Sequence, residues 1–401
     1  MPLPARLDTL TQDTASIGDL SWWELYNDTT LQQLIHRALT YNKDLKIASA
    51  RMNELAALKR VDFANMFPQA TARLNGNRET TNYGGDNFDA DSELSLTASI
   101  SWELDLWGNL RWARDRSTAE FLASVENCRA VKMGLVAQVA QSYFELMALD
   151  NELAIVRRTL EARREGVRLA EIRFKGGLTS EIVFQQAKVE LAKTATMVPD
   201  LERRISLKES EIALLTGDFP YAVNRNILPE EIQLPNALPL GLPSTLLERR
   251  PDIRKAEREL MAAHAEVGLA YTNMFPRLAL TATLGTESET LRDFLKSPYS
   301  YLVGNLLSPL FAMGKNRAAL KAKRAAYEGA VAEYEQTVLT AFKETHDAII
   351  NFNKIKDIYE SRRQLAEASR TAVELAQLQY INGVIGYLDL LDAQRNYFDA
   401  Q

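Results

Sequence analysis

Two acidic residues near the end of the chain have a spacing that suggests a chemical role. Asp389 and Asp392 lie three positions apart at the start of a predicted helix, so their side chains share one helical face. Two carboxylates on one face repel each other and attract cations. A simpler role fits the same spacing, because acids in a first helical turn are stabilised by the helix dipole. The spacing alone leaves both roles open.

The other side chains that carry catalytic or metal chemistry are not arranged for it. His36, His264 and His346 are scattered, with no HExxH motif and no carboxylates at ligand spacing, so no metal site is predicted. The single cysteine, Cys128, excludes a disulfide framework and a cysteine-based zinc cage, and its size suits helix packing. The sequence has no P-loop, no Gly-rich dinucleotide turn and no Gly-x-Ser-x-Gly motif. We therefore predict no catalytic residue, no cofactor and no enzyme activity.

Charge and hydropathy narrow the choice of partner. The chain has 47 Lys and Arg against 53 Asp and Glu, a net charge of −6, so nucleic acid is not an expected partner. No stretch approaches the roughly 18 consecutive apolar residues of a membrane helix. The opening residues, MPLPARLDTL, contain neither the basic nor the apolar region of an export signal, so we expect either a cytosolic protein or one whose export signal has been removed.

The chain repeats itself at half its length. The tetrapeptide NMFP stands at 65–68 and again at 273–276, an offset of 208. Further pairs follow in the same order at nearly the same offset: Asp44 with Asp252, Gly108 with Gly314, and Gly177 with Gly383. We therefore predict a duplication. Its parts are a first repeat at 1–217, a Pro-rich linker at 218–243 and a second repeat at 244–401.

Each repeat is expected to contribute one β-hairpin, at about 67–107 and about 276–311. Apolar and polar residues alternate along 94–106 and 277–284, which is the period of a strand. Polar loops are predicted at 75–93 and 285–298. Aromatic residues lie within or beside these strands, at positions that suit either a membrane-interface girdle or an ordinary core: Trp102, Trp107, Trp112, Tyr299 and Tyr301.

Very long helices follow the hairpins, at 108–175 and 314–381. Neither range contains proline, and apolar residues recur every 3.5 positions, as in helices packed side by side. Ser142 and Arg163 interrupt this apolar repeat in the first helix. At 1.5 Å per residue, each helix would extend roughly 100 Å. Shorter helices, at 180–217 and 387–401, are expected to run back from the two tips.

Four strands per chain cannot close a membrane barrel, and lipid cannot satisfy open strand edges. Single-chain barrels begin at about eight strands, a number whose interior is filled by side chains. Two copies would give only eight strands, whereas three copies of four strands would give twelve and leave a channel. Closure therefore favours a homotrimer.

Motifs along nearly the whole chain resemble the outer membrane factor family, the TolC-like exit ducts of bacterial tripartite efflux pumps. The chain is most similar to the lipoprotein branch that serves resistance–nodulation–division (RND) pumps. The motifs are WWELYNDTTLQQLIHRALTYNKDL (22–45), RRPDIRKAE (249–257), NMFPRLALTATLG (273–285), SPLFAMGKNRA (308–318) and YINGVIGYLDLLDAQRNYF (380–398).

The resemblance implies a mixed, mainly α fold. A trimeric twelve-stranded outer-membrane β-barrel would continue into a long periplasmic α-helical barrel, conducting drugs or other small molecules passively. A periplasmic adaptor, an RND-type inner-membrane pump and outer-membrane lipid would be its partners. Asp389 and Asp392 would line the constricted end of the tube as acidic rings, and Tyr380 would help to hold it shut. The adaptor would contact the helix tips at Gly177, Leu178, Thr179, Ser180, Gly383, Val384, Ile385 and Gly386.

The chain departs from the family pattern in three places. The signal peptide and lipidated cysteine of this branch are absent, so we expect that Met1 marks a trimmed or partial chain. The last helix stops at Gln401, before the length of its counterpart. The first-half position that matches Asp389 is Val183, so the family's polar link between helices is not expected there.

Two alternatives to a drug duct remain. One is a soluble coiled-coil scaffold or adaptor with a small sheet, and its glycines at the tips would serve only the turns. The other keeps the same fold but exports metal ions or, as in type I secretion, polypeptides.

Overall fold

The computed structural model describes residues 28–81, 84, 89–225, 249–289, 293, 295–309 and 311–401. Its helices are α2 (Thr29–Tyr41), α3 (Lys43–Ala64), α4 (Asn109–Lys175), α5 (Glu181–Leu215), α7 (Pro251–Thr272), α8 (Lys315–Ile381) and α9 (Tyr387–Ala400). Its strands are β1 (Gln69–Thr81), β2 (Asp89–Leu104), β3 (Arg277–Ser288) and β4 (Pro298–Leu307). The predicted mainly α fold with four strands is confirmed. No helix in the described ranges has the length and hydropathy to cross a membrane.

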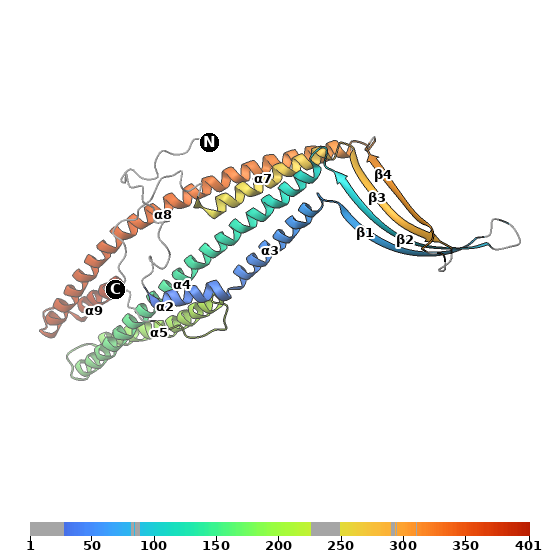
Figure 1. Cartoon of the computed structure of the whole chain (residues 1–401). Helices are drawn as coiled ribbons and strands as arrows, with labels where there is room; N and C mark the ends of the chain where they lie inside the picture. Colours follow the sequence, from blue (N-terminus) through green and yellow to red (C-terminus); the bar gives the residue numbers. More distant parts are fainter. Residues whose placement is uncertain are drawn as a thin grey trace. The chain divides into compact units, whose positions relative to one another are not determined.

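The strands form one antiparallel sheet in the order β1-β2-β3-β4, seen side by side in Figure 1. Its register gives the sheet two different faces. A typical row of one face joins Ala70, Ile100, Ala282 and Leu302, whereas the next row, on the other face, joins Thr71, Ser99, Thr283 and Tyr301. One face is therefore apolar and the other carries hydroxyl groups, as the alternation along 94–106 predicts.

The predicted polar loops at 75–93 and 285–298 are wrong in extent. β1 continues to Thr81 and pairs residue by residue with β2 down to Asp89, and β3 continues to Ser288. Polar composition alone indicated a loop, but backbone pairing between two strands in register does not require apolar side chains. Strand pairing therefore extends well into both polar stretches.

The helices of the two tips form hairpins, α4 with α5 and α8 with α9 (Figure 1). Where α4 was predicted to carry an apolar seam, most of that seam is buried: Leu135, Val139, Leu146, Leu149, Leu153, Val156 and Ala170. A main apolar core packs α2 against α4 and α5, with Tyr143 fully buried in it. A second core of four buried residues joins α4 to α5, and Phe398 of α9 packs on it.

The chain divides into two compact units, and each draws residues from both halves of the sequence. One unit contains the helix tips (1–46, 131–246 and 340–401), and the other contains the sheet (47–130 and 247–339). The division into repeats at 217 and 244 stays a prediction about the sequence. Most of the predicted linker, 226–243, lies outside the described residues, as does the stretch 22–27 of the first family motif.

Candidate functional site

The two candidate gate acids lie on the solvent side of α9. Asp389 and Asp392 are both exposed, whereas Leu390 and Leu391 between them are buried. The Asp389 carboxylate also accepts a hydrogen bond from the Gly386 backbone N–H at 3.0 Å. Asp389 therefore caps its own helix, which is the simpler of the two roles open to it, and its exposed charge remains available for the other.

Tyr380 lies between the ends of two helices. Its side chain is buried, with the Arg173 guanidinium 4.5 Å above the ring centroid and the Tyr387 ring 5.9 Å away in an edge-on contact. Arg173 belongs to the last turn of α4, Tyr380 to the last turn of α8 and Tyr387 to the start of α9. Tyr380 thus links the two hairpins through a cation–π contact.

The two tips are built alike. Gly177 and Gly383 have positive φ angles of 70° and 72°. After each glycine the next N–H donates back across the turn, from Leu178 to the Arg173 carbonyl and from Val384 to the Gln379 carbonyl. This is the Schellman ending, in which glycine avoids the strain of a left-handed conformation. The glycines are thus required by the turns. Leu178 and Val384 expose large apolar side chains there, at 76% and 71%.

A polar cluster with a buried centre, Arg163 and Glu190, and a half-exposed outer member, Arg395, joins α9 to both helices of the first hairpin. We call it the Arg163 cluster: Arg163 of α4, Glu190 of α5, and Gln394 and Arg395 of α9. The Arg163 guanidinium donates to the Gln394 amide oxygen at 2.6 Å and lies 3.9 Å from the Glu190 carboxylate. Arg395 donates to the same carboxylate. The hydrogen bond from Arg395 keeps the pKa of Glu190 below its usual range, and burial lowers the pKa of Arg163.

Because Val183 matches Asp389, no polar link between the helices is predicted at that position, and this stays a prediction. The Arg163 cluster forms a polar link between the helices through other residues. The sequence carried a signal for it, because Arg163 interrupts the apolar repeat of α4. Ser142, the other interruption, is also buried and donates to Glu211 of α5 at 3.0 Å. A polar residue at a core position therefore marked a contact between helices in both cases.

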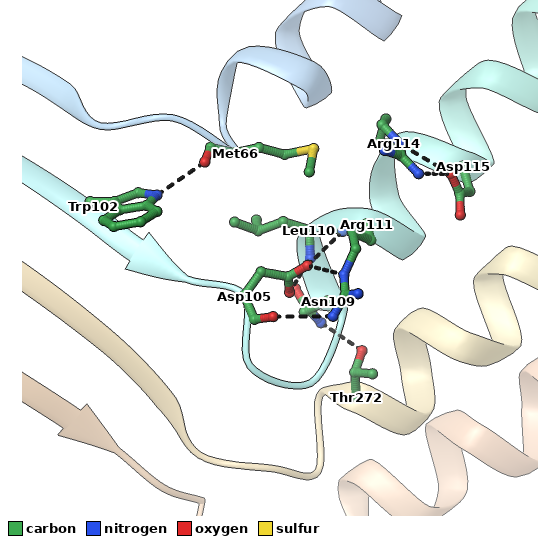
Figure 2. Close-up of polar contacts among 9 residues, drawn as sticks. All are labelled: Met66, Trp102, Asp105, Asn109, Leu110, Arg111, Arg114, Asp115 and Thr272. Carbon is green, nitrogen blue, oxygen red and sulfur yellow. Dashed lines mark hydrogen bonds and ion pairs between the residues drawn. The ribbon is translucent and has the colours of Figure 1, made fainter.

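The turn between β2 and α4 is held by one carboxylate. Asp105 accepts hydrogen bonds from the backbone N–H groups of Leu110 and Arg111, at 3.0 and 3.1 Å, and pairs with the Arg111 side chain (Figure 2). These are N–H groups of the first helical turn, which have no partner inside a helix. Gly108 makes the turn possible with a φ of 80°. Asp105 therefore fixes the direction in which α4 leaves the sheet.

The motifs that the sequence repeats meet at this turn. Asn109 donates to Thr272 at the end of α7, at 2.9 Å (Figure 2). It also donates to Asn273, at 3.0 Å. Next to it, the Trp107 indole donates to the Pro276 carbonyl and its ring stacks on Phe275, with centroids 5.0 Å apart. The second NMFP turn (273–276) therefore lies against the turn between β2 and α4, whose sequence is DLWGN (105–109).

The first NMFP turn makes a similar contact. Trp102 of β2 donates to the Met66 carbonyl at 3.0 Å (Figure 2). The indole N–H groups of Trp102 and Trp107 thus bind both NMFP turns to the base of the sheet. The sequence alone did not predict these hydrogen-bond partners. Trp112, by contrast, lies inside α4 against His264 of α7, at 5.6 Å, so it packs between helices.

In the described part of the chain, no three histidine, cysteine, aspartate or glutamate side chains are grouped as metal ligands.

Comparison with known proteins agrees with this arrangement. The model of the outer membrane efflux protein family matches residues 34–218 and 242–401. The outer membrane protein OprJ of Pseudomonas aeruginosa is 32% identical over 398 residues, which cover 96% of this chain and 82% of OprJ. The toluene efflux pump outer membrane protein TtgC of Pseudomonas putida is 30% identical and covers 99% of this chain and 83% of its own length.

Solved structures give the same result. The outer-membrane channel OprN superposes with a TM-score of 0.92 at 31% identity, and the match covers 100% of this chain and 91% of that structure. The predicted resemblance to the TolC-like exit ducts is confirmed. The chain belongs to the outer membrane efflux protein family, and it is an outer-membrane efflux channel.

Proposed function

We propose that three copies of the chain form one duct, which passively conducts organic small molecules from the periplasm to the exterior. The observation that carries this proposal is the two-faced sheet. Its apolar face is exposed in the single chain, as at Leu74 (68%), Leu284 (67%) and Leu302 (74%). Among the described strands, β1 and β4 each pair on one side only. In a membrane barrel closed by further copies, lipid would cover the apolar face and neighbouring strands would pair with the edges of β1 and β4.

The polar face supports an organic cargo. Hydroxyl groups line its middle rows, with Thr71 and Ser99 in contact at 3.1 Å and Ser101 and Thr281 at the same distance. The two rows that contain Gln69 and Thr71 carry no charged side chain, whereas the rows on either side of them hold Glu103 and Arg73. Uncharged rows of this kind offer hydrogen bonds to an organic molecule but do not hold an ionic cargo tightly. TtgC, which resembles this chain, is named for toluene efflux. We infer a similar class of uncharged or weakly charged organic cargo here.

The helix tips supply the gate and the partner contact. Three copies of Asp389 and Asp392 around the axis would form two acidic rings, which Tyr380 and its contact with Arg173 would help to keep narrow. The tip residues, Gly177 to Ser180 and Gly383 to Gly386, of which Thr179 and Ile385 are partly buried, would meet a periplasmic adaptor that joins the duct to an inner-membrane pump. The pump would supply the energy.

Planar bilayer recordings test this proposal. The wild-type protein should give a small, cation-selective conductance. The double variant Asp389→Asn/Asp392→Asn removes both charges while the asparagine side chain can still accept the capping hydrogen bond, so cation selectivity should fall. Glu181→Gln, at the first turn of α5, is the matched control and should change nothing. Unchanged selectivity in the double variant would leave Asp389 a helix cap only. No conductance from folded, inserted protein would overturn the duct.

A further inference from the structure

The Arg163 cluster holds more positive than negative charge. Arg163 and Arg395 share the single carboxylate of Glu190, and the side chains of Arg163 and Glu190 are both only 7% exposed. The Nε atom of Arg163 is buried and has no hydrogen-bond partner among the described residues. A buried ion pair with an unsatisfied donor contributes little net stability, because desolvation offsets the attraction. The arrangement of the cluster therefore suits a role in orienting α9 better than a role in stabilising the fold.

The cluster decides which way α9 faces. Gln394 and Arg395 are held by α4 and α5, and Leu390 and Leu391 are buried on the same helix. With these contacts made, Asp389 and Asp392 remain on the exposed side. Because these two contacts come from two different helices, they oppose a rotation of α9 about its axis.

Arg395 has a second possible partner. Asp392 lies three positions earlier on α9, a spacing at which an acid and a base on one helix can pair. In this structure Arg395 instead reaches across to Glu190 on α5. Lys193 on α5 also adds positive charge near Glu190, and burial raises the pKa of Tyr387 beside Arg163. Glu190 is therefore the carboxylate that Arg395 contacts directly, whereas Asp392 attracts Arg395 only at longer range and accepts a hydrogen bond from Asn396 at 3.3 Å.

We propose that Glu190, with Arg163, fixes the rotation of α9 and keeps Arg395 from forming a direct ion pair with Asp392, so that the carboxylate of Asp392 stays accessible toward the pore. This inference rests on the proposed function, because it assumes that the acidic pair lines the conducting path. It makes Glu190, Arg163 and Arg395 positioning residues for cation selectivity.

Two substitutions should change selectivity in opposite directions. In Glu190→Gln, Arg395 loses its partner and turns to Asp392, so the ratio of K⁺ to Cl⁻ permeability should fall by about twofold. In Arg395→Gln, the positive charge near Asp392 is gone, so the ratio should rise. Reversal potentials in a salt gradient across a planar bilayer measure both. A purely structural role for the cluster would not predict opposite signs.

Glu202→Gln is the matched control. It removes an ion pair between the same two helices, Arg157 of α4 with Glu202 of α5 at 2.7 Å, but that pair is exposed at 58% and 50%. It should leave the permeability ratio at the wild-type value. Thermal unfolding in detergent would verify that each variant is folded.

A variant in which Arg163, Glu190 and Arg395 become Met, Leu and Met separates positioning from stability. Its melting temperature should be close to that of the wild type, because buried ion pairs are often replaced by apolar groups without loss. Its selectivity should nevertheless differ from the wild type. If Glu190→Gln and Arg395→Gln both keep the wild-type ratio while Asp389→Asn/Asp392→Asn lowers it, the positioning role is wrong and the proposed gate stands. If that double variant changes nothing either, the acids do not line the path.

Discussion

Gly285 is the residue on which the position of two tyrosine rings depends. A Cβ atom at this position would lie 2.6 Å from Cζ of Tyr299, so only glycine lets that ring rest flat on the sheet. The ring in turn stacks on Tyr301, with centroids 6.0 Å apart and planes 1° from parallel. On the polar face, two flat rings narrow the proposed duct less than two upright ones would.

Substitution of this glycine should therefore affect conduction. In Gly285→Ala, the Tyr299 ring must move off the sheet, which should reduce single-channel conductance and cost less than about 1 kcal/mol of stability, because the ring is only partly buried. Gly304→Ala is the control on the neighbouring strand, because its Cβ would meet Leu280 at 3.6 Å, an ordinary contact. Equal conductance in the two variants would show that the rings do not limit the path.

At the scale of the elements, the β2–α4 turn depends on Asp105. Asp105→Ala removes the acceptor of two N–H groups of the first turn, which should lower the free energy of unfolding by about 0.5–2 kcal/mol. The amides of Leu110 and Arg111 should also exchange hydrogen faster. Asp115→Ala, six residues into α4, breaks only the exposed pair with Arg114 and should fall within about 0.5 kcal/mol of the wild type. Unchanged exchange in Asp105→Ala would refute the capping role.

Sequence predicted elements better than it predicted contacts. The long helices and the alternating strands follow from periodicity, which is a local property, and the bounds of the two long helices agree with the structure to within one residue. The ends of the strands could not be predicted in this way. Pairing between β1 and β2 extends through polar residues, and their composition by itself indicates a loop. The partners of Arg163 also could not be predicted from periodicity. Residue 163 and Gln394 are separated by 231 positions, and only the break in the apolar repeat pointed to a contact.

At the scale of the whole molecule, the unpaired edges of the sheet are the strongest argument for assembly with further copies of the chain. Within the described strands, β1 and β4 are the outer members, and each carries a row of backbone groups with a partner on one side only. Burying such edges in lipid without partners is prohibitive. If three copies close the barrel, β1 of one copy must lie beside β4 of the next, which a cross-linking experiment can detect.

Cysteines placed in one row of the apolar face test this arrangement. Ala70→Cys on β1 and Leu302→Cys on β4, with Cys128→Ala as background, should yield covalent trimers when membranes are treated with a flexible bismaleimide. Ile100→Cys with Ala282→Cys is the matched control: these residues pair within one chain, so the reagent should join them without raising the mass. Monomers from both variants would contradict closure between copies. A ladder that continues beyond three chains would indicate a larger ring, because a closed ring of three leaves no β1 or β4 edge free for a fourth copy.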